Sequence, residues 1–436
     1  MSAAAASRRV VITGLGVISP LGNSVESMAT AIAEGRSGVA ALQTLPPMEA
    51  LATYGGEARD FTGHIDDFGE LEKDAKKAIR KALKMMSRES MMAVAAAQQA
   101  IGDAGATGAA PERAGVVFGC DYLLSPPEDL LAGMLKCGVA EGDFQSERWG
   151  EDGLAEMNPL WMLNYLPNMP ASHIAIFNDF RGPNNSLTMR EAAGVMAIRE
   201  AAQTIARGHA DAMLAGATGS RIHSFKTIHA HQTEQLADPS LPPAEACRPF
   251  DARRTGMVVG EGAGAVLLEE RNAALARGAT IYGEIIGTGS ATATDGDLHA
   301  RRADALALAG RAALDEAELD TAALGHVSAH GLGDTACDEA EAAALACILD
   351  GAAADTPVAA AKSYFGNLGA GSGVVELIAS LLSLQSGALL PTLNFSEPDP
   401  KCPVKVSQSG DLAGDSFLKL TVTPQGQAAA LAVSRG

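Results

Sequence analysis

Strand-like apolar runs alternate with alanine-rich helical runs along most of the chain, and this alternation limits the possible folds more than any other feature. The pattern predicts strands at residues 10–13, 114–118, 212–215, 263–268, 280–286, 326–329, 358–360 and 429–433. It predicts helices at residues 24–34, 73–103, 192–208, 304–317, 338–349 and 373–387. Strands interleaved with helices are typical of α/β proteins, whose sheets are covered by helices. We therefore expect an α/β fold with largely buried sheets.

Length and composition favour one large folded unit or two fused ones. The chain has 436 residues, of which 47% are apolar, and this is ample for a buried core. Aromatic residues make up only 4%, so helices and strands should pack closely through alanine and glycine. The longest apolar runs are interrupted before about 18 residues, so no membrane span is predicted.

Charge and cysteine spacing exclude several classes of protein. The formal net charge of −19 argues against nucleic-acid binding, which needs a basic surface. The cysteines show no paired spacing of the kind found in metal sites or disulfide frameworks. We therefore expect free thiols, a cytoplasmic location, no metal and no bound cofactor. The six cysteines are Cys120, Cys137, Cys247, Cys337, Cys347 and Cys402.

The chain divides into two similar halves near the run Arg-Pro-Phe-Asp at residues 248–251. The predicted N-terminal half covers residues 1–255 and the predicted C-terminal half covers residues 256–436. Each half begins with a β-rich stretch and places a key residue at the end of a strand. Residues 123–168 have weak periodicity, and we expect them to form an insertion in the first half that covers a cleft.

Four sets of motifs carry a resemblance to a known family. They are the strand and glycine turn at residues 9–22, the Gly-Pro-Asn run at 182–184 followed by a long alanine-rich helix, the runs at 248–251 and 260–264, and the late loop at 391–400. In this order and spacing they resemble the β-ketoacyl-carrier-protein synthases (ketosynthases) over nearly the whole chain. The resemblance implies a thiolase-like αβαβα five-layered sandwich, built from two related halves and normally dimeric.

The resemblance also locates a catalytic centre, and this chain departs from it. Glu191 stands at the position of the family's nucleophilic cysteine, and Asn367 stands at its second histidine, while His330 and Lys362 match the first histidine and the lysine. In the family the cysteine holds the acyl chain and the histidines support decarboxylation of a malonyl unit. A carboxylate is a poor acyl acceptor, because acylation would give a high-energy mixed anhydride. The altered C-terminal loop at 422–428 carries Pro424, which lacks a backbone N–H donor.

Three expectations concern the neighbours of these residues. Glu191 should hydrogen-bond to amides of the first helical turn or pair with Arg190, because a carboxylate is stabilised at a helix N-terminus. Lys362 should be buried near Glu341 as an ion pair, because a buried charge needs a partner. Cys337 is not expected to replace the missing nucleophile, because it lacks the helix N-terminus that activates a thiol.

A basic run at residues 73–88 is a candidate docking face. Its spacing places five basic residues on one face of the predicted helix, and these are Lys73, Lys77, Arg80, Lys84 and Arg88. In so acidic a chain, this face can receive an acidic acyl carrier protein, whose phosphopantetheine arm would then be a ligand of the site. The alternative is a solvated helix face with no partner.

Two functions stay open. The leading interpretation is a non-condensing ketosynthase homologue, similar to the chain-length factors that partner a catalytic ketosynthase subunit in fatty-acid or polyketide-type biosynthesis and shape its acyl tunnel. Residues 190–194 resemble the sequence around the replaced cysteine of those partners. The dimer is then a heterodimer with the ketosynthase, or a homodimer. The alternative is a stand-alone enzyme, either a malonyl-carrier decarboxylase or an unusual acyltransferase (3-oxoacyl-carrier synthase), with Glu191 as a general base. A condensing synthase is least favoured, because residue 191 is not cysteine.

Overall fold

The computed structural model describes residues 8–45, 52–352 and 355–436, so the first seven residues of the predicted N-terminal half lie outside it. Within these residues ten strands form one continuous mixed sheet, in the order β10-β9-β11-β12-β8-β1-β7-β6-β4-β5. The strands are β1 (Val10–Ile18), β4 (Ala114–Cys120), β5 (Asn184–Leu187), β6 (Ala212–Ser220), β7 (Glu261–Glu270), β8 (Gly283–Thr292), β9 (His326–Ser328), β10 (Val358–Ala359), β11 (Ser416–Val422) and β12 (Gln427–Ser434). Strands β2 (Val39–Ala41) and β3 (Tyr54–Gly56) pair separately.

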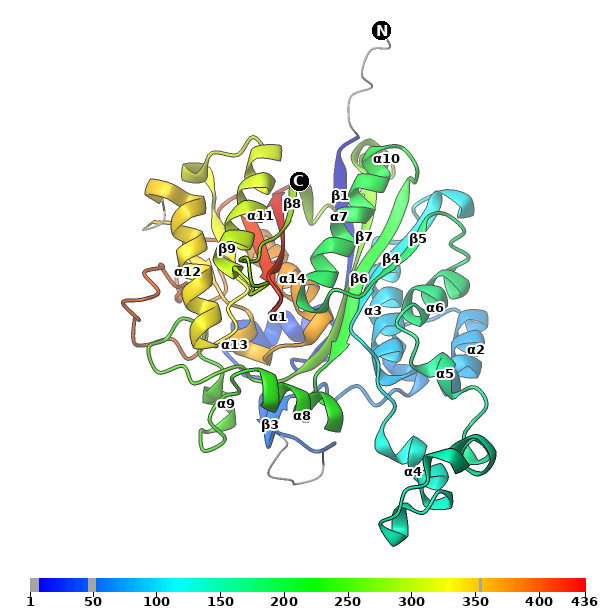
Figure 1. Ribbon diagram of the computed structural model, residues 1–436. Helices are drawn as coiled ribbons and strands as arrows, with labels where there is room; N and C mark the ends of the chain where they lie inside the picture. The colour runs from blue at the N-terminus through cyan, green and yellow to red at the C-terminus, as the bar shows by residue number, and fades with distance from the viewer. Residues whose placement is uncertain (1–7, 46–51, 353–354) are drawn as a thin grey trace.

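Helices pack on both faces of this sheet and give it five layers. Helices α7 and α14 lie between the two parts of the sheet, α3 covers the outer face of the first part, and α11 covers that of the second, with α12 packed on α11 (Figure 1). The longer helices are α1 (Val25–Ala33), α2 (Lys73–Ala82), α3 (Arg88–Ala104), α4 (Pro127–Lys136), α6 (Met169–Asn178), α7 (Ala193–Ala206), α8 (Ser224–Thr233), α10 (Arg271–Ala276), α11 (Arg302–Glu316), α12 (Thr335–Leu349) and α14 (Ser372–Ser386). The shorter helices are α5 (Trp161–Asn164), α9 (Pro243–Ala246) and α13 (Lys362–Phe365). The predicted α/β sandwich is confirmed.

The two parts of the sheet repeat one topology. In the first part, β4 is parallel to β5 and β6, while β7 is antiparallel to β6 and β1. In the second part, β9 is parallel to β10 and β11, while β12 is antiparallel to β11 and β8. The parts join where residues 10–12 of β1 pair with residues 283–285 of β8. The structure therefore contains the two related halves that the sequence predicts.

The same close packing of helix on strand occurs in both halves. The first strand of each half, β1 or β8, carries two glycines two residues apart, and the outer helix packed on it, α3 or α11, presents two backbone carbonyls to them. A methyl group on any of these glycines would clash with a helix carbonyl oxygen: Gly14 with Ala100, Gly16 with Ala96, Gly287 with Ala313, and Gly289 with Ala309. Helix and strand therefore pack closely through small residues, as expected, where α3 meets β1 and where α11 meets β8.

The predicted helix at residues 73–103 is two helices. Helix α2 ends at Ala82, a 3-10 turn follows at Leu83–Met85, and α3 begins at Arg88. Ser87 caps the second helix, because its side-chain oxygen accepts a hydrogen bond from the backbone N–H of Ser90 at 3.2 Å. The prediction of one helix was wrong, because Ser87 in the middle of the run acts as an N-cap and begins a second helix.

Residues 123–168 stand out from the body of the molecule around α4 in Figure 1. The segment contains α4, α5 and several short helical turns. Its role as a cover for a cleft remains a prediction, and so does the boundary between residues 255 and 256. Strand β7 begins at Glu261, after this boundary in the sequence, but in the sheet it lies between β1 and β6 of the first part. No helix in the described residues is both long enough and apolar enough to span a bilayer.

Candidate functional site

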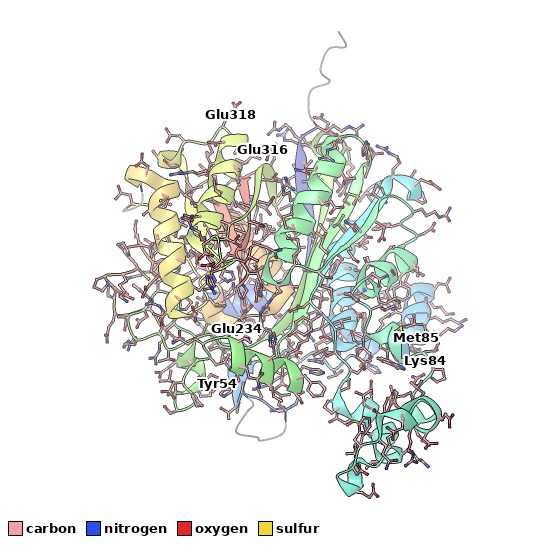
Figure 2. The ribbon with its side chains drawn as sticks, in the orientation of Figure 1. Tyr54, Lys84, Met85, Glu234, Glu316 and Glu318 are labelled. Atoms are coloured by element: carbon pink, nitrogen blue, oxygen red, sulfur yellow. The ribbon has the colours of Figure 1, made fainter. Side chains whose placement is uncertain are left out.

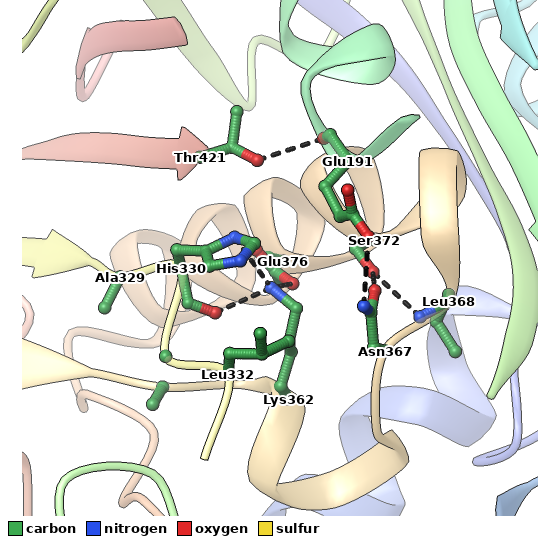
Figure 3. A network of polar contacts seen from close by, with 12 residues as sticks. Glu191, Ala329, His330, Leu332, Lys362, Asn367, Leu368, Ser372, Glu376 and Thr421 are labelled. Carbon is green, nitrogen blue, oxygen red and sulfur yellow. Dashed lines mark hydrogen bonds and ion pairs between the residues drawn. The ribbon is translucent and has the colours of Figure 1, made fainter. Parts of the chain in front are cut away.

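Glu191 lies in a sharp turn between β5 and α7. The turn is a short 3-10 helix at Arg190–Ala192 that runs directly into α7. Arg190 has a positive φ of 47°, which is uncommon for a residue with a side chain and is found often at functional sites. The Glu191 side chain is directed inward and the residue is 1% exposed. Its backbone carbonyl accepts a hydrogen bond from the Thr421 hydroxyl at 3.0 Å, which ties the turn to β11 (Figure 3).

Two arginines and two glutamates form a closed ion network at this turn, which we call the arginine network: Arg190, Glu191, Arg221 and Glu234. Arg221 donates through one nitrogen to Glu191 and through the other to Glu234 at 2.9 Å. Arg190 donates to Glu234 at 2.8 Å and lies 3.6 Å from the Glu191 carboxylate. Burial alone would raise the pKa of Glu191, but Arg221 and then Arg190 outweigh it and hold this pKa well below its usual value. Glu191 is therefore ionised at physiological pH.

The pairing of Glu191 with Arg190 agrees with the prediction, whereas Arg221 and Glu234 were not predicted. Arg221 follows β6, and Glu234 ends α8, so both come from segments far from residue 191 in the sequence. Neither residue lies in one of the motifs that carry the resemblance. No signal in a single sequence identifies such partners.

Asn367 connects Glu191 to the start of α14 (Figure 3). Its side-chain nitrogen donates to Glu191 Oε1 at 3.1 Å and to the sulfur of Met257 at 3.0 Å. Its side-chain oxygen accepts from the backbone N–H of Gly369 and from the hydroxyl of Ser372, both at 3.1 Å. Because both ends of the amide are engaged, Asn367 has no donor left for a substrate oxygen.

His330 lies directly after β9, where one acidic and one basic side chain fix its backbone. Glu341 on α12 accepts hydrogen bonds from the backbone N–H groups of His330 and Gly331, both at 2.7 Å. Lys362 donates to the backbone oxygen of His330 at 2.6 Å and lies 3.3 Å from its Nδ1. Since an ammonium group can only donate, we assign Nδ1 as the acceptor and place the proton of the neutral ring on Nε2.

Lys362 belongs to a second buried network, which we call the lysine network: Lys362, Glu376 and Lys419. Lys362 pairs with Glu376 at 2.6 Å, and Lys419 pairs with the other oxygen of the same carboxylate. The predicted partner Glu341 is therefore wrong, although Lys362 is buried as expected. The physical reason is that Glu341 binds two backbone N–H groups, whereas Glu376 on α14 lies between both ammonium groups.

His330 is held in its neutral form. Burial lowers its pKa well below the usual value, and the charge of Lys362 lowers it further, while Glu191 has the opposite and weaker effect. The ring can therefore donate one hydrogen bond through Nε2, and it does not carry a positive charge at neutral pH. The four predicted site residues, Glu191, His330, Lys362 and Asn367, surround one region of the structure (Figure 3).

A cavity of about 130 Å³ lies beside this region. Its lining includes the beginning of the altered C-terminal loop, and the cysteine nearest to His330 in the sequence. Cys337 lies in the first turn of α12, so the expectation that it lacks a helix N-terminus was wrong. Burial nevertheless raises the pKa of Cys337 well above its usual value, so this thiol is un-ionised and weakly nucleophilic. The lining residues are Glu191, Thr233, Glu234, Gln235, Met257, Arg302, His330, Leu332, Asp334, Ala336, Cys337, Val422, Thr423 and Pro424. None of them comes from the 123–168 segment.

The basic run does not form one continuous face. Lys73, Lys77 and Arg80 lie on α2, but Lys84 lies in the 3-10 turn after it. The Arg88 side chain pairs with the buried Glu261 at 2.7 Å. Including Arg88 in a docking face was therefore wrong, because the chain turns between α2 and α3 and directs this side chain inward. In Figure 2, Lys84 lies towards the edge of the molecule, well apart from Glu234, which lines the cavity.

The described residues contain no group of three or more histidine, cysteine or acidic side chains arranged to hold a metal ion. The six cysteines are free thiols.

Comparison with known proteins gives consistent matches over nearly the whole chain. Residues 7–274 match the family model of the beta-ketoacyl synthase N-terminal domain, and residues 282–396 match that of the C-terminal domain. The chain is 32% identical to 3-oxoacyl-[acyl-carrier-protein] synthase 2 of Synechocystis sp. over 400 residues, which cover 91% of this chain and 90% of the relative.

Solved structures give the same result. A beta-ketoacyl synthase from Burkholderia phymatum matches with a TM-score of 0.83 and 27% identity, covering 98% of this chain and 100% of the other. The ishigamide ketosynthase/chain length factor matches with a TM-score of 0.81 and 28% identity, covering 99% and 100%.

Proposed function

This chain belongs to the beta-ketoacyl synthase family, and we propose that it is a non-condensing member, which pairs with a catalytic ketosynthase and shapes the tunnel for the growing acyl chain. The observation that carries this proposal is the state of Glu191. Its carboxylate stands at the N-terminus of α7, the position that the motif resemblance implies for the nucleophile, and Arg221 and Asn367 both bind it. An ionised carboxylate held by two donors is a weak nucleophile, and its acyl derivative would be a reactive anhydride.

Three further positions of the expected centre, Asn367, Pro424 and Cys337, do not supply groups that condensation needs. Asn367 spends both amide hydrogens on Glu191 and Met257, so it gives no hydrogen bond to a developing oxyanion. Pro424 lines the cavity without a backbone donor. Cys337 borders the same cavity, but its raised pKa keeps it un-ionised.

A partner subunit is supported by an unpaired sheet edge. Strand β5 ends the sheet and hydrogen-bonds only to β4 among the described strands, so its outer backbone groups are available for pairing. Helix α6 packs beside β5 and exposes Ile176, which is 71% exposed. Further large apolar side chains are exposed in the 123–168 segment: Leu131, Leu135, Phe144, Leu154, Leu160 and Met162. An exposed apolar side chain beside a free sheet edge favours a protein–protein interface at β5, and the apolar residues around α4, which stand apart from β5 in Figure 1, offer a separate contact surface. One of the matched structures is described as a ketosynthase/chain length factor.

An acyl carrier protein is the second proposed partner. Helix α2 carries Lys73, Lys77 and Arg80, and Lys84 follows it, in a chain whose net charge is −19. Such a local basic surface can attract an acidic carrier and bring its phosphopantetheine arm to the complex. Reversing Lys77 and Arg80 to glutamate should weaken carrier binding at low salt, whereas unchanged affinity would contradict this docking face.

The first experiment asks whether Glu191 accepts an acyl group. The purified chain is incubated with acyl-carrier thioesters and analysed by intact mass spectrometry, with Glu191→Cys as the matched comparison. We expect no acyl adduct on the natural chain. The thiol that this substitution introduces should react readily with iodoacetamide, because Arg221 and the helix N-terminus favour a thiolate there. An acyl adduct on Glu191, or condensation by the isolated chain, would contradict the proposal.

The second experiment tests the partner. The chain is co-expressed with a catalytic ketosynthase from its own genome and purified through a tag on one subunit. We expect a stoichiometric complex that Ile176→Glu weakens. Leu412→Glu is the control, because Leu412 is 74% exposed and lies away from β5, in the connection between α14 and β11. A homodimer that ignores the ketosynthase would contradict the heterodimer.

A stand-alone decarboxylase is the alternative, and one observation favours it. His330 is neutral, is oriented by Lys362, and borders the cavity next to Glu191. A neutral imidazole that donates through Nε2 can stabilise an enolate oxygen. Release of carbon dioxide from malonyl-carrier protein by the natural chain, lost in both Glu191→Ala and His330→Ala, would support this activity. No carbon dioxide release by the natural chain would exclude it.

A further inference from the structure

Arg302, the first residue of α11, is a cation without a counter-ion. It makes no hydrogen bond or ion pair with any residue in the described ranges, and its Nε is buried without a partner. The neighbouring Arg301 differs, because it is exposed and pairs with Asp304. A partly buried guanidinium without an anion is unfavourable, because it gives up hydration without gaining a partner. The position of Arg302 therefore requires an explanation.

The side chain of Arg302 borders the 130 Å³ cavity that also touches His330. The cavity opens to solvent past Thr233, Gln235 and Ala336, all of which are exposed. Pockets for drug-sized ligands are typically about 300 Å³ or larger. This cavity is therefore suited to a group of only a few heavy atoms, and an extended acyl chain would not fit in it.

The hydrogen-bonding groups at the cavity are matched to a small anion. Arg302 offers a planar fork of N–H donors, and neutral His330 offers Nε2–H, since its Nδ1 faces the Lys362 ammonium. The acidic residues in the lining already have partners. Arg221 binds both Glu191 and Glu234, and Asp334 accepts the backbone N–H of Cys337 at 2.7 Å.

We propose that this cavity binds a small carboxylate group, with Arg302 as its charged partner and His330 as a second donor. A carboxylate matches the geometry of one guanidinium fork and carries a single charge. A phosphate dianion fits less well, because the carboxylates of Glu191, Glu234 and Asp334 stand in the same wall. The proposal goes beyond the scaffold role, since a subunit that only shapes a neighbour's tunnel needs no ligand here.

The test measures binding of acetate to the full-length chain by NMR titration with isotopically labelled acetate at low ionic strength and neutral pH. Arg302→Gln is the test variant and Arg301→Gln is its matched control. We expect saturable binding that Arg302→Gln weakens by about tenfold or more, as the loss of one charge-assisted contact predicts. Arg301→Gln should leave the affinity within about twofold, because its side chain pairs with Asp304 at the surface. Acetamide, a neutral analogue of similar shape, should not compete.

Two further measurements distinguish the loss of the guanidinium fork from the loss of charge or of the fold. Arg302→Lys retains the charge without the fork and should bind acetate with intermediate affinity. Thermal unfolding of each variant shows whether the fold is intact. No saturable binding to the natural chain, equal binding by Arg302→Gln, competition by acetamide, or tighter binding of inorganic phosphate than of acetate would each overturn the proposal. These outcomes do not depend on acyl loading or on the partner subunit, so they are distinct from the tests of the proposed function.

Discussion

The arginine network and the lysine network meet at one site, yet they differ in origin and in burial. The arginine network comes from the first half of the chain, from the turn before α7, the end of β6 and the end of α8. Its side chains are 2–17% exposed. The lysine network comes from the second half, from α13, α14 and β11, and its side chains are 0–1% exposed. Asn367 hydrogen-bonds to Glu191 and to Ser372, the first residue of the helix that carries Glu376.

The difference shows which part of the site maintains the fold and which part can change. Lys419 donates to the backbone oxygen of Ala329 at 3.0 Å, and Lys362 donates to that of His330 at 2.6 Å, so the lysine network fixes the end of β9. The arginine network borders the cavity and binds few backbone groups. We infer that the second half holds the framework, while residues at the turn of the first half can be exchanged without loosening it.

The largest expected effect comes from removing the only carboxylate of the lysine network. Glu376→Gln leaves Lys362 and Lys419 buried beside each other without a counter-ion. We expect a loss of about 3–5 kcal/mol in the free energy of unfolding, measured by urea denaturation. Adding Lys419→Met to this variant should recover part of the loss, because one of the two like charges is removed. A loss below about 1 kcal/mol would show that the network does not hold the framework.

Acidification should sharpen the comparison, because the arginine network and the two histidines at β9, His326 and His330, respond to it differently. Burial lowers the pKa of His326 to about 4, and burial likewise lowers that of His330. A histidine whose folded pKa is lowered takes up its proton more readily when unfolded. Stability is therefore complete above the unfolded pKa of about 6.5 and falls as the pH drops towards the folded pKa. In the arginine network, Glu191 stays ionised over this range, because its pKa is held low.

For His326 alone, the predicted loss at pH 5 relative to pH 7.5 is about 2 kcal/mol. His326→Asn should reduce the pH dependence by about that amount in denaturation curves between pH 5 and 7.5. The control is His299→Asn, because the His299 side chain is 78% exposed, whereas His326 is buried. Equal slopes in the natural chain and in His326→Asn would contradict the prediction.

The smallest effect should come from neutralising the residue at the nucleophile position. In Glu191→Gln, Arg221 and Arg190 still share Glu234, so no arginine is left without a carboxylate. We expect a loss of about 1–2 kcal/mol, again by urea denaturation. The inference that the turn can change would be wrong if this loss equalled that of Glu376→Gln.

Much of the fold could be predicted from the sequence, because the apolar periodicity of the long elements is strong. Strands β1, β4, β6, β7, β8, β9, β10 and β12 were predicted in part or in full. Strand β5 was missed because Asn184–Leu187 is short and polar, and its conformation depends on pairing with β4. Strand β11 was missed although Ser416–Val422 is fully buried, because its apolar alternation is interrupted by Lys419. That lysine is buried through its pairing with Glu376, which a single sequence does not show.

Only the site residues that lie within recognisable motifs could be predicted from the sequence. Glu191, His330, Lys362 and Asn367 were located by resemblance, and the structure places them around one region. The partners Arg221, Glu234 and Glu376 were not predicted, and Lys362 was assigned the wrong carboxylate. These contacts join segments that are distant in sequence, and their geometry depends on the packing of loops. Arg302 was missed for the same reason, since an arginine at the start of a helix normally points to solvent.

The glycine pairs that seat α3 on β1 and α11 on β8 bear on the history of the molecule. Both halves place an outer helix on its strand through the same clash-limited contact, at equivalent places in an identical strand order. Such a match is what the duplication of an ancestral half-length gene would leave behind. The ionic centres near the inner helices differ between the halves, whereas the backbone contacts that a single methyl group would destroy are common to both.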